Sequence, residues 1–126
     1  MRDDVTIGLI TWNAFDALKV SYEYHLLNTP KETKFTIIDN NSLQQVGNFL
    51  KEKQKDRHFE IKIILNKDNF GFARACNQLF ESCETEYLIL MNPDIFVVAP
   101  DWLDKLIVAF ERHKEDKIGL LGCKLV

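Results

Sequence analysis

The sequence predicts a single α/β domain, in which a mostly parallel, Rossmann-like sheet has helices on both faces. Short runs of β-branched and apolar residues alternate along the chain with segments whose apolar residues recur at helical spacing. The connections between these segments are short, which is typical of repeating βα units with right-handed crossovers. At 126 residues and 46% hydrophobic, the chain can bury one core but not two.

Four runs are expected to form the parallel strands, and the first, which is apolar on both faces and rich in β-branched residues, has the composition of a buried parallel strand. They lie at residues 5–11, 35–39, 61–65 and 87–91. The segment 95–98, between two prolines, is expected to be a short additional extended piece. Residues 118–126 are predicted to form a last strand, interrupted by two glycines.

Helical periodicity predicts four helices between and after these strands. The first covers residues 15–28 and ends before a proline. The others begin after Ser42, after Gly71 and after Asp101. Ser42 and Asp101 have side chains that can cap a helix amino terminus, and we expect them to do so.

Charge and hydropathy exclude several classes of protein. The net charge is −3 and the pI about 5.6, so the chain has no basic surface for nucleic acid. Its apolar runs are too short to span a membrane, and the first residues do not resemble a signal peptide. We therefore expect a cytoplasmic protein.

The cysteines and histidines give no metal or disulfide pattern. Cys76 and Cys83 fall seven apart in one predicted helix, so their Cα atoms are roughly 10 Å apart, too far for a disulfide. Together with Cys123 they are expected to be small buried residues. Two aromatic residues are expected in the core, and the three histidines on the solvated surface: Trp102 and Phe110, and His25, His58 and His113.

Polar, turn-forming clusters follow all four predicted strands. They lie at residues 11–13, 39–42, 66–69 and 92–94. In an open parallel α/β sheet the carboxyl ends of the strands share one edge, and ligands bind in the crevice there. Carboxylates and amides gathered at that edge predict a site for a polar, metal-assisted ligand.

These clusters, in this order, resemble glycosyltransferase family 2, a group of nucleotide-sugar-dependent enzymes with the GT-A fold. The matching segments are residues 11–13, 38–42, 69–77, 86–94 and 100–103. The Asn-x-Gly-Phe-Ala and Asn-Pro-Asp motifs are most similar to those of the rhamnosyltransferase-type branch. The resemblance covers only the nucleotide-binding, amino-terminal half of the usual family domain. It therefore implies a single domain over residues 1–126, truncated at its carboxyl-terminal side.

The resemblance implies that Asp39 binds the base of a nucleotide. A carboxylate there accepts a hydrogen bond from the pyrimidine N3–H, which selects uracil or thymine over cytosine. Asn41 and Ser42 continue the cluster and are assigned to the nucleotide site with it. The alternative is that Asp39 is only an Asx-turn residue that ends the strand.

Asn92-Pro93-Asp94 matches the Asp-x-Asp signature of the family, with Asn in place of the first acid. The resemblance implies that Asp94 is a ligand of Mg²⁺ or Mn²⁺, ions that take oxygen ligands and are shared with phosphate oxygens. Asn92 offers a carbonyl oxygen or a hydrogen bond to the sugar. The alternative is an ordinary Asn-Pro turn.

Five further residues complete the expected nucleotide site. Gly71 allows a close backbone approach, and the helix after it aims its amino terminus at the ligand. The resemblance places an arginine just before Asn77, but this chain has Cys76 there. The role of Arg74 is therefore left open: it either contacts a phosphate or forms an ion pair with Asp68 or Asp94. The site residues other than the two carboxylates, Asn41, Ser42 and Asn92 are Thr11, Asn13, Asn69, Gly71 and Arg74.

The resemblance implies transfer of a sugar from a UDP- or dTDP-sugar to the hydroxyl of a saccharide or lipid-linked acceptor, with inversion. It places the general base in the half of the family domain that would follow Val126, so no catalytic residue is assigned in this chain. The alternative is a truncated or degenerate module that binds the nucleotide without transfer. A homodimer through the uncovered edge near Val126 is also expected, as is contact with the inner face of the membrane through partners.

Two unrelated doubly wound folds fit the residues less well. A receiver-type signalling domain needs an acidic pair after its first strand, where this chain has Asn13. A dinucleotide site needs Gly-x-Gly-x-x-Gly after that strand, and this pattern is missing from the sequence.

Overall fold

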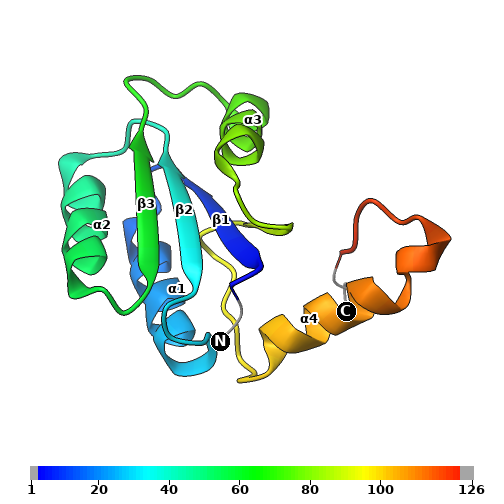
Figure 1. Ribbon diagram of the computed structural model, residues 1–126. Coiled ribbons are helices and arrows are strands. Elements are labelled where there is room, and N and C mark those ends of the chain that lie inside the picture. The colour runs from blue at the N-terminus through cyan, green and yellow to red at the C-terminus, as the bar shows by residue number, and fades with distance from the viewer. Residues whose placement is uncertain (1–2, 123–126) are drawn as a thin grey trace.

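The computed structural model describes residues 3–122 of the chain (Figure 1). Its four strands pair in parallel in the order β3-β2-β1-β4, which confirms the predicted sheet. Each strand begins and ends within one residue of the sequence prediction. The strands are β1 Val5–Thr11, β2 Lys34–Asp39, β3 Glu60–Leu65 and β4 Tyr87–Met91.

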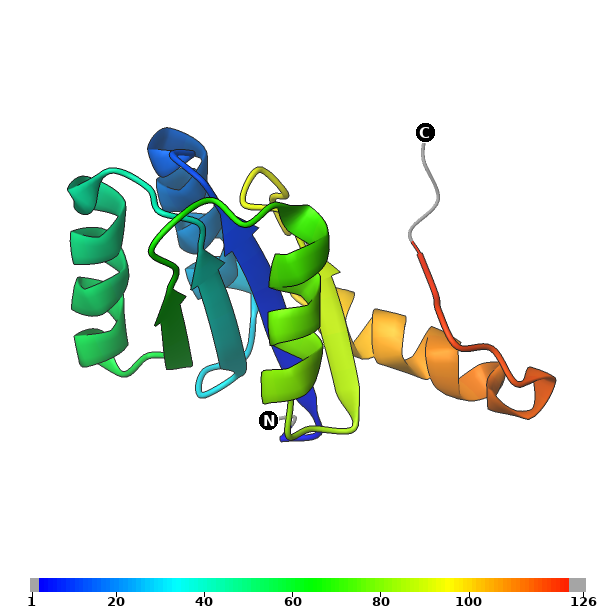
Figure 2. The same cartoon turned by 90° about the horizontal axis from the view of Figure 1, so that it is seen from above.

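Helices cover both faces of the sheet, as predicted. α1 and α2 lie on one face, here called the α1/α2 face, and α3 lies on the other (Figures 1 and 2). α4 begins beside the sheet and runs away from it, and a short 3-10 helix, η1, follows. The bounds are α1 Phe15–Asn28, α2 Gln44–Asp56, α3 Phe72–Ser82, α4 Trp102–Arg112 and η1 Lys114–Asp116.

The main core lies between the sheet and the α1/α2 face, because alternate strand residues point to this side. Strand residues such as Ile7 and Phe35 pack there against Leu18, Val46 and Leu50 of the two helices. These five side chains are at most 4% exposed. The α1/α2 layer therefore fixes the register and twist of the strands that carry the polar clusters.

A smaller core lies on the α3 face. Ile38 of β2 packs there against Ala75 and Leu79 of α3. Gly8 of β1 faces α3 directly, and a Cβ atom at this position would lie 2.9 Å from Leu79 Cδ1. The lack of a side chain at Gly8 thus lets α3 approach the sheet closely.

α4 packs against the amino-terminal end of β1 through a third hydrophobic cluster. Leu103 and Ile107 pack against Val5, with Trp102 beside them. The expectation that Trp102 belongs to the core is confirmed, and Phe110, also half-buried, makes an edge contact with Tyr87 at 5.6 Å between ring centroids.

The two additional extended pieces do not form strands. The segment 95–98 lies along α1, where Ser21 Oγ donates to the carbonyl of Ile95 at 2.9 Å and Asn28 Nδ2 to that of Val97 at 2.8 Å. The carbonyl groups of Ile95 and Val97 therefore accept from side chains of α1 and not from the backbone of a neighbouring strand. Residues 118–122 also have no strand structure, and the remainder of that prediction, 123–126, lies outside the described residues.

The histidine prediction holds only in part. His113 is exposed and His58 half-buried, but the prediction for His25 is wrong because it is only 1% exposed. Its ring lies against Phe35 and Trp102, at centroid distances of 5.1 and 6.0 Å. His25 sits on the inward stripe of α1, where its flat ring packs like an aromatic side chain.

The cysteine prediction also holds only in part. Cys76 and Cys83 are free thiols, as expected, but both are half-buried rather than buried, and Cys123 lies outside the described residues.

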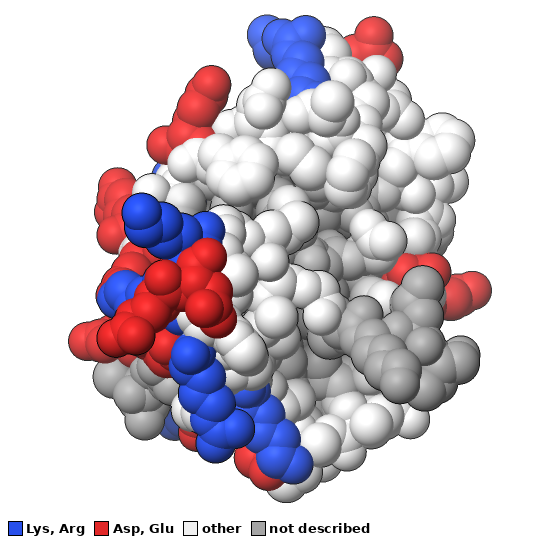
Figure 3. Space-filling model, turned by 90° about the vertical axis from the view of Figure 1, so that its right-hand side faces the viewer, with Lys and Arg blue, Asp and Glu red and all other residues white. Residues whose placement is uncertain are grey.

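The surface toward the free edge of β4 carries few charges. Figure 3 shows most of the acidic and basic side chains along the left border of this view, a few at the top and right, and an uncharged central region. Large apolar side chains are exposed on α3 and β4, namely Phe72, Phe80 and Leu90. Within residues 3–122, no helix combines the length and the apolar character that a membrane span requires.

Candidate nucleotide site

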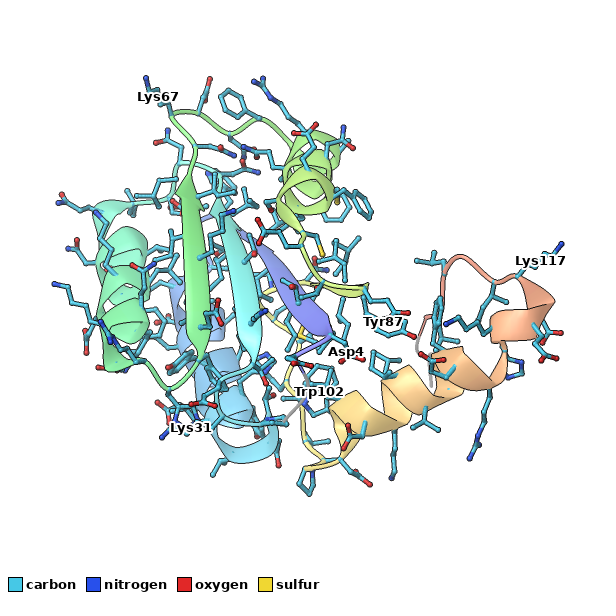
Figure 4. All side chains as sticks on the ribbon, viewed as in Figure 1. Asp4, Lys31, Lys67, Tyr87, Trp102 and Lys117 are labelled. Carbon is cyan, nitrogen blue, oxygen red and sulfur yellow. The ribbon has the colours of Figure 1, made fainter. Side chains whose placement is uncertain are left out.

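The polar clusters meet at the carboxyl edge of the sheet. Thr11, Asp39 and Leu65 are register partners at the ends of β1, β2 and β3. Figure 4 shows Lys67, just past β3, at this edge and Lys31, before β2, at the opposite one. Because β2 and β4 lie on opposite sides of β1, the winding of the sheet reverses between β1 and β4, and ligands of open α/β sheets bind at such a point.

Asp39 ends β2 and is held from two sides by Ser42. The Ser42 hydroxyl donates to Asp39 Oδ1, and the Ser42 backbone N–H donates to Oδ2 at 3.2 Å. These bonds close a turn, so the Asx-turn interpretation of Asp39 is correct as geometry. It does not compete with ligand binding, because a carboxylate has about four acceptor positions and Ser42 occupies two. Asp39 is 4% exposed.

Ser42 does not cap α2, which corrects the sequence prediction. The helix begins at Gln44, and Leu43 is its N-cap residue. The Ser42 hydroxyl is already engaged, since it accepts from the Asn13 backbone N–H at 2.8 Å and donates to Asp39. Asp101 is the N-cap residue of α4 but makes no capping bond, because its carboxylate pairs with Lys105 at 3.0 Å.

Asn13 joins the loop after β1 to the start of α2. Its Oδ1 accepts from the backbone N–H of Leu43 at 2.7 Å. It adopts a left-handed conformation with φ +52°, and so does Asn41 with φ +65°. Asparagine tolerates this region better than most residues, so both positions shape the loops around Asp39. Asn13 therefore belongs to a turn and does not cap α1, whose N-cap residue is Ala14.

Thr11 contributes a hydroxyl without a partner. It is 1% exposed, and its Oγ1 makes no hydrogen bond to any of residues 3–122. Strand alternation places Thr11 on the α1/α2 face, the same face as Asp39. A buried polar atom without a partner is uncommon in proteins, and in a binding site it indicates a position that a ligand or a water fills.

Asn69, Gly71 and Arg74 belong to the loop and helix after β3. Asn69 Oδ1 accepts from the Gly71 N–H at 2.9 Å, and Gly71 has φ +83°, which favours glycine. Arg74 is exposed and places its guanidinium 3.8 Å from the centroid of the Phe70 ring. Among residues 3–122 it forms no ion pair with Asp68 or with a carboxylate of the 92–94 turn.

Three residues of this edge were not assigned to the site from the sequence, although two of them lie in the predicted polar clusters. Asn40, Asn66 and Gln78 form a chain of amide hydrogen bonds between β2, β3 and α3. Asn40 and Asn66 each follow a predicted strand directly, and that position was a usable signal. Gln78 gives no signal in the sequence, because a glutamine within a helix is most often a surface residue.

Asp94 follows β4, which lies on the opposite side of β1 from β2. The N–H of Ile95 donates to the carbonyl of Asn92 at 3.2 Å, which closes a turn around Pro93 and Asp94. The Asn-Pro turn interpretation is therefore correct as geometry. β2 and β4 are separated by two strand spacings, or roughly 10 Å. Asn92 and Asp94 are both exposed.

Few side-chain oxygen atoms at this edge of the sheet are available to bind a metal ion. Within the described part of the chain, no three His, Cys, Asp or Glu side chains are grouped so that they could hold a metal ion. Mg²⁺ and Mn²⁺ do not need such a group, because at phosphate sites they keep waters and take one or two protein carboxylates. One exposed carboxylate beside an amide carbonyl fits an ion that is shared with a diphosphate, and does not fit a structural metal site.

The model of the family described as Glycosyl transferase family 2 matches residues 6–119. The chain belongs to glycosyl transferase family 2. The match extends from β1 to the residues after η1, and so includes all four polar clusters. A comparison with curated proteins found no match.

Solved structures share the fold of this family 2 chain. S. aureus TarS 1-349 in complex with UDP-GlcNAc is 17% identical with a TM-score of 0.75, over 88% of this chain and 32% of TarS 1-349. The mannosyltransferase PcManGT from Pyrobaculum calidifontis, in complex with GDP-Man and Mn²⁺, is 16% identical with a TM-score of 0.75. That match covers 87% of this chain and 33% of PcManGT. The GT-A expectation for the fold is confirmed, and the chain spans about a third of these structures.

Proposed function

We propose that this chain is the nucleotide-binding part of a glycosyltransferase that uses a nucleoside-diphosphate sugar. In this proposal the base lies against Asp39 and Thr11, and the diphosphate crosses β1 toward a divalent cation beside Asp94. The donor carries uracil or thymine, as in UDP- or dTDP-sugars. The sugar passes with inversion to a hydroxyl of a saccharide or lipid-linked acceptor.

The main support for the proposal is that a nearly buried carboxylate lies beside an unpartnered hydroxyl at the carboxyl edge of the sheet, at the ends of β2 and β1. Asp39 is oriented by Ser42 and keeps acceptor positions free, while Thr11 Oγ1 has no partner among residues 3–122. Uracil and thymine present an N–H donor between two carbonyl groups. A carboxylate accepts from that N–H, and a hydroxyl donates to a neighbouring carbonyl.

The diphosphate end is supported by the chemistry of the residues around it. Asp94 offers a carboxylate and Asn92 an amide oxygen to a cation, which supplies charge stabilisation for the departing diphosphate. The first turn of α3 has no side-chain cap, so its N–H groups are open to a phosphate. Arg74, stacked on Phe70, lies in the same turn and supplies positive charge.

The finer assignments rest on the sequence. The 69–73 and 92–94 segments support the rhamnosyltransferase-like branch, and the cytoplasmic location stays a prediction. The same holds for a homodimer and for contact with the membrane through partners. The proposed domain covers residues 1–126, and the general base for an inverting transfer is not assigned to any of these residues.

A thermal-shift comparison of UDP with CDP tests the base assignment. Cytosine has an acceptor where uracil has N3–H, so the two ligands differ at the contact with Asp39. UDP at 100 times its dissociation constant should stabilise the protein by about 2.7 kcal/mol, and CDP by much less. Asp39→Asn should bring the two ligands to similar affinity. Asp16→Asn, on the exposed side of α1, is the matched control and should leave the UDP preference intact.

The metal assignment has its own test. Mn²⁺ should increase the UDP-dependent shift in the native chain, and EDTA should remove the increase. Asp94→Asn should abolish the Mn²⁺-dependent part, whereas Asp68→Asn, another exposed carboxylate at this edge, should not. An equal Mn²⁺ effect in the Asp94 variant and the native chain would exclude Asp94 as the ligand. A parallel series with dTDP, GDP and ADP defines the base preference.

The alternative function is a module that binds nucleotide without transferring sugar. The sparse ligand set favours it, because Asn92 stands where the family signature has an acid and no three-ligand group lies within residues 3–122. Donor turnover separates the two functions. If the bound donor is consumed and its sugar is released or transferred, the protein is an enzyme. If the donor binds but is not consumed, even by a longer form of the protein, the chain is a binding module.

A further inference from the structure

A network of side-chain amides connects the ends of β2 and β3 with the middle of α3. Asn66 Nδ2 donates to Asn40 Oδ1 at 2.9 Å and to Gln78 Oε1 at 2.8 Å. Gln78 Nε2 donates back to Asn66 Oδ1 at 2.8 Å. Asn66 therefore uses both of its side-chain N–H donors and its oxygen. The two-point contact with Gln78 fixes both the distance and the orientation between β3 and α3.

Asn40 extends this network to the start of α3. Its Nδ2 donates to the carbonyl of Gly71 at 3.4 Å, at the long end of the hydrogen-bond range, while Asn69 Oδ1 accepts from the Gly71 N–H at 2.9 Å. Gly71 is thus held at both its amide and its carbonyl by asparagine side chains. It has φ +83° and directly precedes the first helical residue, Phe72.

The same network is tied through the backbone to the proposed base site. The Asn40 N–H donates to the carbonyl of Thr11 at 2.9 Å, and the Asn66 N–H donates to the carbonyl of Asp39 at 2.9 Å. Asn40 and Asp39 are neighbours whose side chains point to opposite faces of the sheet. The Asp39 side chain is held from the α1/α2 side, and the adjoining loop is held from the α3 side.

Because these amides are partly or fully buried, the loss of one of their hydrogen bonds costs stability. Asn40 is 3% exposed, and Asn66 and Gln78 are half-buried. A buried amide that loses its partner bears the full cost of its desolvation, so the network loosens when one member is removed. Asn77, next to Gln78 on α3, is exposed and has no part in this network within residues 3–122.

We propose that Gln78 is a positioning residue for the donor site. Through its pair with Asn66 it holds the segment 66–71 and with it Gly71 and the open first turn of α3. It acts through Asn66 and Asn40 and does not touch the donor. This inference rests on the proposed function for its consequence in binding, whereas the clamp on segment 66–71 stands on the structure alone.

Hydrogen exchange of the ligand-free protein tests the clamp. In Gln78→Met, which keeps the size of the side chain and removes both bonds, residues 66–74 should exchange roughly five- to tenfold faster. The α2 segment 44–56 should exchange as in the native chain, which separates a local effect from general destabilisation. Asn77→Leu, the matched amide-to-apolar change one residue away, should alter neither segment. Unchanged exchange of 66–74 in Gln78→Met would overturn the proposal.

UDP affinity with Mn²⁺ then tests the role in binding. Gln78→Met should bind UDP roughly fivefold more weakly, and Asn77→Leu should bind like the native chain. Gln78→Glu keeps the acceptor for Asn66 Nδ2 but places a second carboxylate oxygen against Asn66 Oδ1, so it should not restore binding. Faster exchange with unchanged UDP affinity would overturn the positioning role. If the native chain binds none of UDP, dTDP or GDP, the proposed function fails, and the exchange result still decides whether Gln78 holds the loop.

Discussion

Thr11 and Asp39 are register partners at the last position of β1 and β2, and their side chains lie on the same face of the sheet. Asp39 has partners from Ser42, whereas the Thr11 hydroxyl has none among residues 3–122. Both residues are nearly buried, at 4% and 1% exposed. A buried hydroxyl without a partner costs stability, which is why we propose that the bound nucleotide supplies its partner.

Thr11→Val removes this hydroxyl and keeps the shape of the side chain. Because no hydrogen bond within the described residues is lost, the free energy of unfolding of the ligand-free protein should stay constant or rise by about 1 kcal/mol. UDP affinity should fall by roughly tenfold, the usual effect of losing one hydrogen bond to a buried ligand group. Urea unfolding measures the first quantity and calorimetric titration the second.

Thr33→Val is the matched control for this prediction. Thr33 is also buried, but its hydroxyl donates to the carbonyl of Pro30 at 2.5 Å, before the amino end of β2. This variant should lose about 1 kcal/mol of stability and bind UDP normally. A Thr11 variant that loses stability as the Thr33 variant does, with unchanged UDP affinity, would show that the Thr11 hydroxyl has a structural partner and no ligand.

Most of the sheet could be predicted because buried parallel strands have a distinct composition. The β1 segment is apolar on both faces, so its bounds are visible in the sequence. The segment 95–98 has a similar composition but lies along α1, because Ser21 and Asn28 bind its backbone. Composition shows that a segment is apolar. It does not show which groups will take its backbone hydrogen bonds.

The candidate site could be located but not assembled from the sequence. The positions of Asp39 and Asp94 after strands placed them at one edge of the sheet. The partners of Ser42 were predicted wrongly, because the helix starts one residue later than its capping pattern suggested and leaves the hydroxyl to Asp39 and Asn13. Gln78 was missed, since its contact depends on how α3 packs on the sheet, which local sequence does not encode.

Two glycines should respond to alanine in opposite ways. Neither position has a heavy atom within 4 Å of an added Cβ, so sterics with neighbours do not decide the outcome. Gly71 has φ +83°, and Gly71→Ala should cost about 1–3 kcal/mol of stability through backbone strain. Gly47 lies inside α2, and Gly47→Ala should stabilise by about 0.5–1 kcal/mol through helix propensity. Urea unfolding of both variants measures the difference.

The ligand response distinguishes the two glycine variants further. Gly71→Ala should weaken UDP binding, because strain at this residue moves the open first turn of α3. Gly47→Ala should leave it unchanged. A stabilised Gly71 variant would mean that the turn before α3 relaxes without cost, and the account of Gly71 as a fixed point of the site would then be wrong.

His25 should make stability depend on pH. Burial lowers the pKa of His25 from 6.5 to about 4. Its Nδ1 is hydrogen-bonded to Thr29 Oγ1 at 2.8 Å, and Trp102 Nε1 donates to the same oxygen at 3.1 Å, while Nε2 has no partner among residues 3–122. The imidazole is therefore neutral in the folded protein, and the charged form would be a buried cation with an unpartnered N–H.

The sign follows from the order of protonation. Between pH 6.5 and about 4 the unfolded chain binds a proton at His25 that the folded chain does not, so the contribution of His25 to stability is full above pH 6.5 and is lost as the pH falls. The loss approaches about 3 kcal/mol at pH 4, because each pKa unit corresponds to 1.36 kcal/mol. Urea unfolding between pH 4 and 7 should show this slope in the native chain and a shallower one in His25→Gln. His113→Gln, at an exposed position, should keep the native slope. Equal slopes in the native chain and in His25→Gln would show that another group controls the acid response.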